Sequence, residues 1–126
     1  MKDGKVTVLY VEDEPNLAEL LRAGLGMFGM TVNPIYCSAE ELLGKINSPE
    51  FAVADIMVLD IRLPGLTGLE LAKRLRGQGE KRPVVIVSAF NRPDQPVLDE
   101  IGATFQPKPF DFEAIVHTIQ SLVTVE

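Results

Sequence analysis

The stretch from Ile56 to Gly68 reads IMVLDIRLPGLTG, an apolar run that ends in one carboxylate and is followed by a loop. Residues 56–59 are all apolar, which is typical of a strand buried on both faces in the centre of a parallel sheet. Asp60 stands at the carboxyl end of that strand, where ligands bind in open α/β sheets. Asp60 alone could be a helix cap, a metal ligand or a nucleophile, and the stretch does not choose between these roles.

The composition predicts a single domain. The chain has 126 residues, of which 46% are hydrophobic and 24% are charged, enough for one core and too few for two ordinary domains. The single cysteine, Cys37, excludes an internal disulfide, and no apolar run is long enough to span a membrane. The net charge of -6 argues against direct binding of nucleic acid. We expect one cytoplasmic domain, residues 1–126, with no membrane anchor.

Strand and helix patterns alternate about five times along the chain. Strands rich in apolar and β-branched residues are predicted at residues 5–11, 31–36, 56–59, 84–87 and 104–106. A helical pattern follows each of them. Parallel strands joined by helical crossovers require a sheet with helices on both faces, because the crossovers are right-handed and pack back onto the sheet. The chain is therefore predicted to be a doubly wound α/β domain.

Proline and capping residues predict where several elements begin and end. Pro34 favours an edge position for the second strand, where a missing amide donor costs nothing. Ser38 has capping-box spacing and opens the second helix, which Pro49 is expected to close. Pro93 and Pro96 predict a fourth helix that is short or distorted at its start.

The residues with chemical potential stand at the predicted strand ends. Three carboxylates, a hydroxyl and an amine should meet on one rim of the sheet: Glu12, Asp13, Asp60, Ser88 and Lys108. Three acids in one crevice repel one another unless they are protonated or bridged by a cation. Oxygen ligands that leave room for water suit Mg²⁺ better than a dedicated Ca²⁺ cage. With one histidine and one cysteine in the chain, the sequence argues against zinc.

Taken in order, these motifs resemble the response-regulator receiver domain of two-component signalling. The resemblance covers essentially the whole chain. Each motif is weak alone, and the set in this order is specific. The matching pieces are VEDE at residues 11–14, Asp55, DIRLPGLTG at residues 60–68, Ser88 with Ala89, and KPF at residues 108–110. The resemblance implies a five-stranded parallel sheet in the flavodoxin-like order 2-1-3-4-5.

The resemblance also implies a chemical role for the strand ends. Asp60 would accept a phosphoryl group from the phosphohistidine of a histidine kinase or phosphotransfer protein and become an aspartyl phosphate. The implied ligands of Mg²⁺ are Glu12, Asp13, Asp60 and the backbone carbonyl of Arg62. The domain would then be a phosphoacceptor that transfers and hydrolyses its own phosphoryl group, and would not be an ordinary enzyme.

Lys108 and Ser88 would each bind a phosphoryl oxygen. In the family, the pull on the hydroxyl is linked to an inward move of an aromatic ring three residues before the lysine, which here is Phe105. The fourth helix, fifth strand and last helix would form the signalling surface. A downstream effector outside this chain would read that surface, and a phosphorylation-dependent dimer is compatible with the resemblance.

Two positions resemble those that tune the lifetime of the aspartyl phosphate. They are Arg62, two residues after Asp60, and Phe90, two residues after Ser88. A bulky apolar Phe90 would impede an attacking water, so we expect a comparatively long-lived phosphoryl group. The segment from Ser88 to Lys108 is shorter than is usual in the family, which points to an unusual fourth helix.

Two other functions fit part of the pattern. An aspartate-nucleophile phosphatase would need a second aspartate near the nucleophile as general acid, and Arg62 occupies that place. A degenerate receiver that acts only as a protein-interaction module would lack some of the expected side chains. Here every expected acidic, hydroxyl and amine position is filled.

Overall fold

The strands lie side by side in one parallel sheet. The computed structural model describes residues 5–90 and 92–123, and within them five strands pair in the order β2-β1-β3-β4-β5. This is the order that the family resemblance implied, and every pairing is parallel. The strands are β1 (Thr7–Val11), β2 (Thr31–Tyr36), β3 (Ile56–Asp60), β4 (Val84–Ser88) and β5 (Ala103–Pro107). The outermost residues of the expected domain, 1–4 and 124–126, lie outside the described residues.

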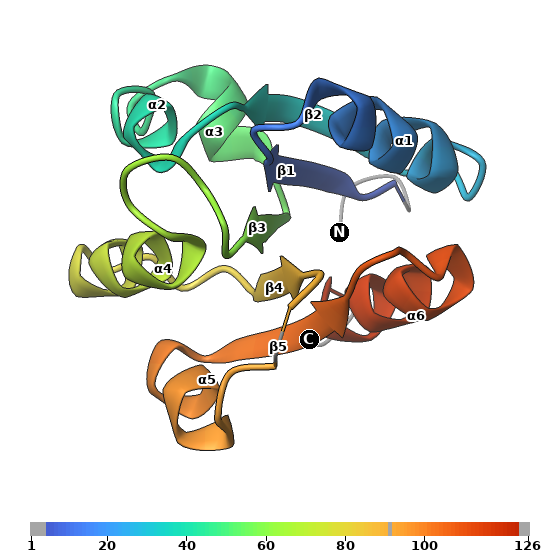
Figure 1. Cartoon of the computed structure of the whole chain (residues 1–126). Helices are drawn as coiled ribbons and strands as arrows, with labels where there is room; N and C mark the ends of the chain where they lie inside the picture. Colours follow the sequence, from blue (N-terminus) through green and yellow to red (C-terminus); the bar gives the residue numbers. More distant parts are fainter. Residues whose placement is uncertain (1–4, 91, 124–126) are drawn as a thin grey trace.

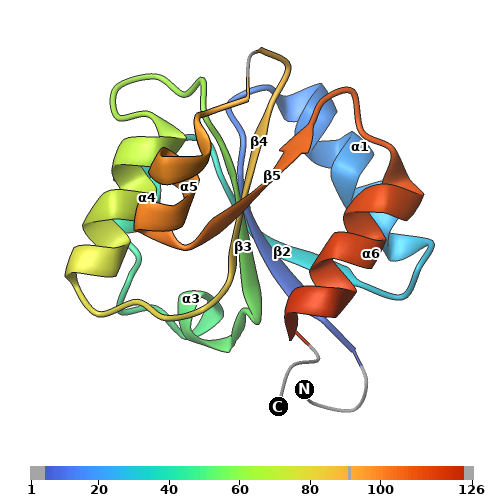
Figure 2. The ribbon, with the colours of Figure 1, turned by 90° about the horizontal axis from the view of Figure 1, so that it is seen from below.

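Helices cover both faces of the sheet (Figure 1). Viewed along the sheet, α1 (Pro15–Gly26) and α6 (Phe112–Val123) lie on one side, and the other helices lie on the opposite side (Figure 2). That second layer contains α2 (Ala39–Leu43), α3 (Pro49–Val53), α4 (Gly68–Gly77) and α5 (Gln95–Ile101). The doubly wound arrangement predicted from the alternation of patterns is confirmed.

The strands divide their side chains between two cores. Successive residues of a strand point to opposite faces, so Leu59 packs with the layer of α2, α4 and α5, whereas Val58 packs with α1 and α6. The whole of β3 and of β4 is buried. Burial on both faces explains why residues 56–59 carry no polar side chain.

The structure corrects the second helix. The predicted helix was expected to run from Ser38 to the proline at 49, but α2 ends at Leu43 and Gly44 caps it. Pro49 begins the separate short helix α3, and Ser48 Oγ accepts the N–H of Phe51 at 3.3 Å. Proline lacks the N–H that a helix interior needs, but the first turn of a helix leaves that group unpaired. The same residue can therefore end one helix or start another.

Two other predictions made from proline positions are confirmed. Pro34 lies in β2, which is an edge strand of the sheet. The fourth predicted helix is α5, a single segment of 7 residues with Pro96 in its first turn, and its N-cap residue Asp94 makes no side-chain cap hydrogen bond. None of the helices in the described part of the chain has the length and apolar character that a membrane crossing requires.

Candidate functional site

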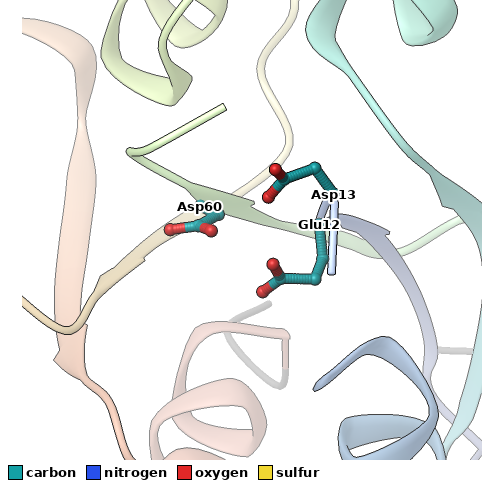
Figure 3. Close-up of side chains that lie close together, drawn as sticks. All are labelled: Glu12, Asp13 and Asp60. Carbon is teal, nitrogen blue, oxygen red and sulfur yellow. The ribbon is translucent and has the colours of Figure 1, made fainter. Parts of the chain in front are cut away.

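Three carboxylates meet at the carboxyl ends of β1 and β3. Val11 pairs with Leu59, so the residues that follow each of them lie next to one another. One carboxylate oxygen from each of Glu12, Asp13 and Asp60 lies within 4.8 Å of the other two. Figure 3 shows the side chains of Glu12 and Asp13 leaving the end of β1 toward the side of Asp60. The sequence placed these acids on one rim, and the structure brings them together.

One lysine holds two of these carboxylates. Lys108 Nζ lies 2.8 Å from Glu12 Oε1 and 3.1 Å from Asp60 Oδ2. Both acids are buried, with 2% and 4% of their surface exposed, whereas Asp13 is exposed. Buried carboxylates need such partners, because removal from water penalises the charged form. Because Lys108 follows β5, its two ion pairs also connect the end of β5 to the ends of β1 and β3.

The cluster carries more negative than positive charge. Burial, together with the negative charge of Glu12, raises the pKa of Asp60 to about 6, although Lys108 opposes the shift. Burial alone would lower the pKa of Lys108, but its hydrogen bonds and charge contacts with Glu12 and Asp60 outweigh burial and raise that pKa. Lys108 is therefore a permanent ammonium at neutral pH. One ammonium cannot offset three carboxylates.

The donor set fits a hard divalent cation. All the converging side-chain atoms of the cluster are carboxylate oxygens, from Glu12, Asp13 and Asp60. Carboxylate oxygens are preferred ligands of Mg²⁺, which usually binds through one or two carboxylates and keeps several waters. The exposed position of Asp13 leaves one side of the cluster open to solvent. The residues present are thus suited to Mg²⁺ and to an incoming group.

Tyr10 also reaches the cluster, and sequence reasoning missed it. Its hydroxyl donates a hydrogen bond to Glu12 Oε1 at 2.8 Å, and its side chain has 0% of its surface exposed. Burial, followed by the charge of Glu12, raises the pKa of the Tyr10 phenol, so the group stays protonated and acts as a donor. The available signal was the spacing. Residues i and i+2 of a strand share a face, which places Tyr10 on the side of Glu12.

Ser88 ends β4 next to Asp60. Asp60 pairs with Val87 in the sheet, so Ser88 is the following residue on the neighbouring strand. The Ser88 side chain is buried, and its Oγ accepts the N–H of Phe90 at 3.0 Å. The Ser88 carbonyl accepts the backbone N–H of Lys108 at 2.9 Å. This bond holds the lysine backbone beside the end of β4.

The two residues predicted to tune lifetime touch each other. The guanidinium carbon of Arg62 lies 4.2 Å from the centre of the Phe90 ring, a cation–π contact. Both side chains are exposed, and they come from the loops that follow β3 and β4. The backbone N–H of Arg62 also donates to Asp60 Oδ1 at 3.4 Å. Arg62 thus bonds to Asp60 through its backbone and contacts Phe90 through its side chain.

Two further residues named in the sequence analysis, Phe105 and Asp55, are not part of the cluster of Glu12, Asp13 and Asp60. Phe105 is half-buried in β5 and pairs with Ile86 of β4. Asp55 precedes β3 at the opposite end of the sheet, and its Oδ2 accepts the N–H of Thr7 at 2.8 Å. Asp55 therefore supports the start of β1, and a switching role for Phe105 stays a prediction.

The loop between β3 and α4 is held close to Asp60. A Cβ atom added at Gly68 would lie 2.1 Å from the Asp60 carbonyl oxygen. Thr67 and Glu70 form a capping box at the start of α4. Glu40 of α2 accepts the N–H of Leu66 at 3.0 Å through its Oε2. These contacts place Gly68, the first residue of α4, directly against the backbone of Asp60.

A family model for the response regulator receiver domain matches residues 8–120. This chain belongs to that family. The receiver domain is 32% identical over 120 residues to "Response regulator MprA" of Mycobacterium tuberculosis, an alignment that covers 94% of this chain and 50% of the relative. It is 31% identical over 124 residues to "Probable transcriptional regulatory protein TcrX" of the same species, covering 96% and 51%. The chain spans about half the length of the curated relatives that it matches.

Solved structures of receiver domains share the fold. The receiver domain of the Francisella response regulator 1452 superposes with a TM-score of 0.81 at 26% identity and covers 94% of this chain and 96% of its own. The response regulator TrrA from Thermotoga maritima, in complex with Mg²⁺ and BeF, gives a TM-score of 0.79 at 27% identity, with 93% and 98% covered. The receiver domain described here is thus part of two-component signalling by family.

Proposed function

We propose that this receiver domain accepts a phosphoryl group on Asp60, with Mg²⁺ bound, from the phosphohistidine of a histidine kinase or phosphotransfer protein. The single observation that carries this proposal is the arrangement around Asp60. The buried carboxylate lies with two other acids within 4.8 Å and is bonded by Lys108 at 3.1 Å. A nucleophile with an adjacent cation and a cluster of oxygen ligands is what phosphoryl transfer requires.

In the proposed reaction, a carboxylate oxygen of Asp60 attacks the phosphorus atom. The new P–O bond forms as the P–N bond to the donor imidazole breaks, and the imidazole leaves with the electron pair and takes up a proton. Lys108 donates to one phosphoryl oxygen. Ser88 can donate to another, because its Oγ accepts a hydrogen bond from Phe90 and keeps its own proton available.

The proposed metal ligands are Glu12, Asp13, Asp60 and the backbone carbonyl of Arg62. When bound there, Mg²⁺ would offset the negative charge that the carboxylates and the phosphoryl group bring together. The Mg²⁺ and BeF bound by the similar TrrA receiver support this part of the proposal.

We further propose that α5, β5 and α6 form the surface that reports phosphorylation. Ser88 ends β4, two residues after Ile86, and Ile86 pairs with Phe105 of the neighbouring strand β5. Shifting a population from 1:99 to 99:1 takes about 5.5 kcal/mol. A few hydrogen bonds to a charged group, at ~1.5–3 kcal/mol each, would supply that. We propose that this domain spans residues 1–126 and is cytoplasmic, and that an effector outside this chain reads the surface.

Asp60→Ala is expected to abolish phosphorylation. Incubation of the wild type with Mg²⁺ and acetyl phosphate should add one phosphoryl group, visible by intact mass, whereas the variant should add none. Chelation of Mg²⁺ should also prevent the adduct. Asp94→Ala is a matched control, because it removes an exposed carboxylate whose side chain makes no cap hydrogen bond. An adduct that persists in Asp60→Ala would reject this acceptor. A wild type that gains no adduct and binds no beryllofluoride would favour the degenerate receiver.

Phe90→Ala is expected to lose the phosphoryl group several-fold faster than the wild type. Phe90 is 60% exposed and its ring stacks with Arg62, whose backbone N–H donates to Asp60, so we expect its removal to open a path for water. Decay of the phosphorylated mass after removal of the donor measures the rate. Phe28→Ala is a suitable control, since that ring is also exposed, at 46%, and follows α1. Faster hydrolysis in the wild type than in Phe90→Ala would contradict the prediction.

A further inference from the structure

Two donors converge on one oxygen of Glu12. The Tyr10 hydroxyl and Lys108 Nζ both lie 2.8 Å from Glu12 Oε1. The other oxygen, Oε2, accepts the backbone N–H of Glu14 at 3.1 Å. Only 2% of Glu12 is exposed, so these protein groups take the place of water around its charge. If one of these donors moves away, the remaining donors must stabilise the charge of Glu12.

The lysine at this oxygen is shared. Lys108 Nζ also lies 3.1 Å from Asp60 Oδ2, the acid that is proposed to take the phosphoryl group. An ammonium that turns toward a phosphoryl group on Asp60 gives up at least part of its bond to Glu12. A buried carboxylate oxygen that loses one donor depends on the donors that remain. When Lys108 turns, the Tyr10 hydroxyl is the hydrogen-bond donor that remains at Glu12 Oε1 among the described residues.

Tyr10 is built to remain at Glu12 when the lysine moves. Its side chain is fully buried in the core between the sheet and α1 and α6. The Tyr10 ring packs against the Phe110 ring in a T-shaped arrangement, with 6.5 Å between the ring centroids and 66° between the ring planes. Tyr10 lies in β1 and Glu12 directly follows the last residue of that strand, so only Val11 stands between them in the chain. The hydroxyl is a donor with fixed geometry.

We propose that Tyr10 is a positioning residue of the phosphoacceptor site, whose hydroxyl holds Glu12 in place and satisfies its charge when Lys108 turns to the phosphoryl group. The inference rests on the proposed function. It assigns to Tyr10 no contact with the phosphoryl group or the metal. The Tyr10 hydroxyl contributes more to holding Glu12 in the phosphorylated state than in the free state, because in the free state Lys108 also donates a hydrogen bond to Glu12.

The test is Tyr10→Phe, which keeps the ring and removes only the hydroxyl. Beryllofluoride, a mimic of the phosphoryl group, is titrated into the full chain at saturating Mg²⁺ and followed by amide NMR. We expect its affinity to fall roughly tenfold, the effect of one hydrogen bond to a charged group. Titration of Mg²⁺ alone should show a smaller change, because no phosphoryl mimic then draws Lys108 away. The same spectra report whether the variant is folded.

Tyr36→Phe is the matched control. It removes the hydroxyl of the other tyrosine, which packs into the core on the opposite face of the sheet, and should bind beryllofluoride like the wild type. Equal beryllofluoride affinity in Tyr10→Phe and the wild type would overturn the inference. Equal losses for Mg²⁺ alone and for beryllofluoride would overturn it too, since they would mark a general structural effect. A wild type that binds no beryllofluoride would instead reject the proposed function, and this inference with it.

Discussion

Lys108→Met is expected to be about 3 kcal/mol less stable than the wild type in Mg²⁺-free buffer at neutral pH, since removal of one partner strands buried charges. The lysine side chain is 9% exposed, and the carboxylate side chains of Glu12 and Asp60 that it pairs are 1% and 5% exposed. Methionine keeps the length of the side chain and removes the charge. Addition of Mg²⁺ should restore much of the lost stability, because a cation at the acidic cluster replaces the missing positive charge.

Urea unfolding with and without Mg²⁺ measures both effects. Lys73→Met provides the control, because Lys73 pairs with Glu100 at 3.4 Å on the surface, with 67% and 59% of the two side chains exposed. An exposed pair of this kind contributes less than about 1 kcal/mol. If Lys108→Met were as stable as the wild type without Mg²⁺, the ammonium would not be what holds the carboxylates together.

Gly68→Ala is expected to destabilise the domain by about 3 kcal/mol and to slow phosphorylation of Asp60, since overpacking beside rigid backbone forces the chain to move. The added Cβ would lie 2.1 Å from the Asp60 carbonyl oxygen, 2.8 Å from its carbonyl carbon and 3.3 Å from the Cα of Ile61. All three atoms belong to the backbone, so no side-chain rotation relieves the overlap. The displaced segment carries Asp60, the proposed phosphoacceptor.

Gly77→Ala is the matched control for this substitution. Gly77 is the last residue of the same helix, α4, and an added Cβ there meets nothing within 4 Å. Alanine at such a helical position should stabilise by about 0.5–1 kcal/mol. Thermal unfolding and the rate of adduct formation with acetyl phosphate separate the two variants. An unchanged unfolding midpoint in Gly68→Ala would show that the loop after β3 can give way without cost.

The buried central strand and the acidic rim could be predicted because both follow from backbone periodicity. An uninterrupted apolar run such as residues 56–59 indicates burial on both faces, and the carboxyl ends of parallel strands meet at one edge. These two rules place Asp60, Glu12 and Asp13 on one rim of the sheet without any knowledge of side-chain conformation. The break between α2 and α3 could not be predicted in the same way, because Pro49 is compatible with a helix end and with a helix start.

The sequence by itself determined the alternation of strands and helices and the position of the acids on one rim, and its motifs, through the family resemblance, indicated the family and the order of the strands. Only the tertiary structure decided which long side chains touch: Lys108 between Glu12 and Asp60, the Tyr10 hydroxyl on Glu12, and Arg62 against Phe90. The physical reason is that strand position depends on local patterns with a fixed period. Contacts between side chains depend on rotamers and on loops that bring distant residues together, as Lys108 and Glu12 are, 96 positions apart.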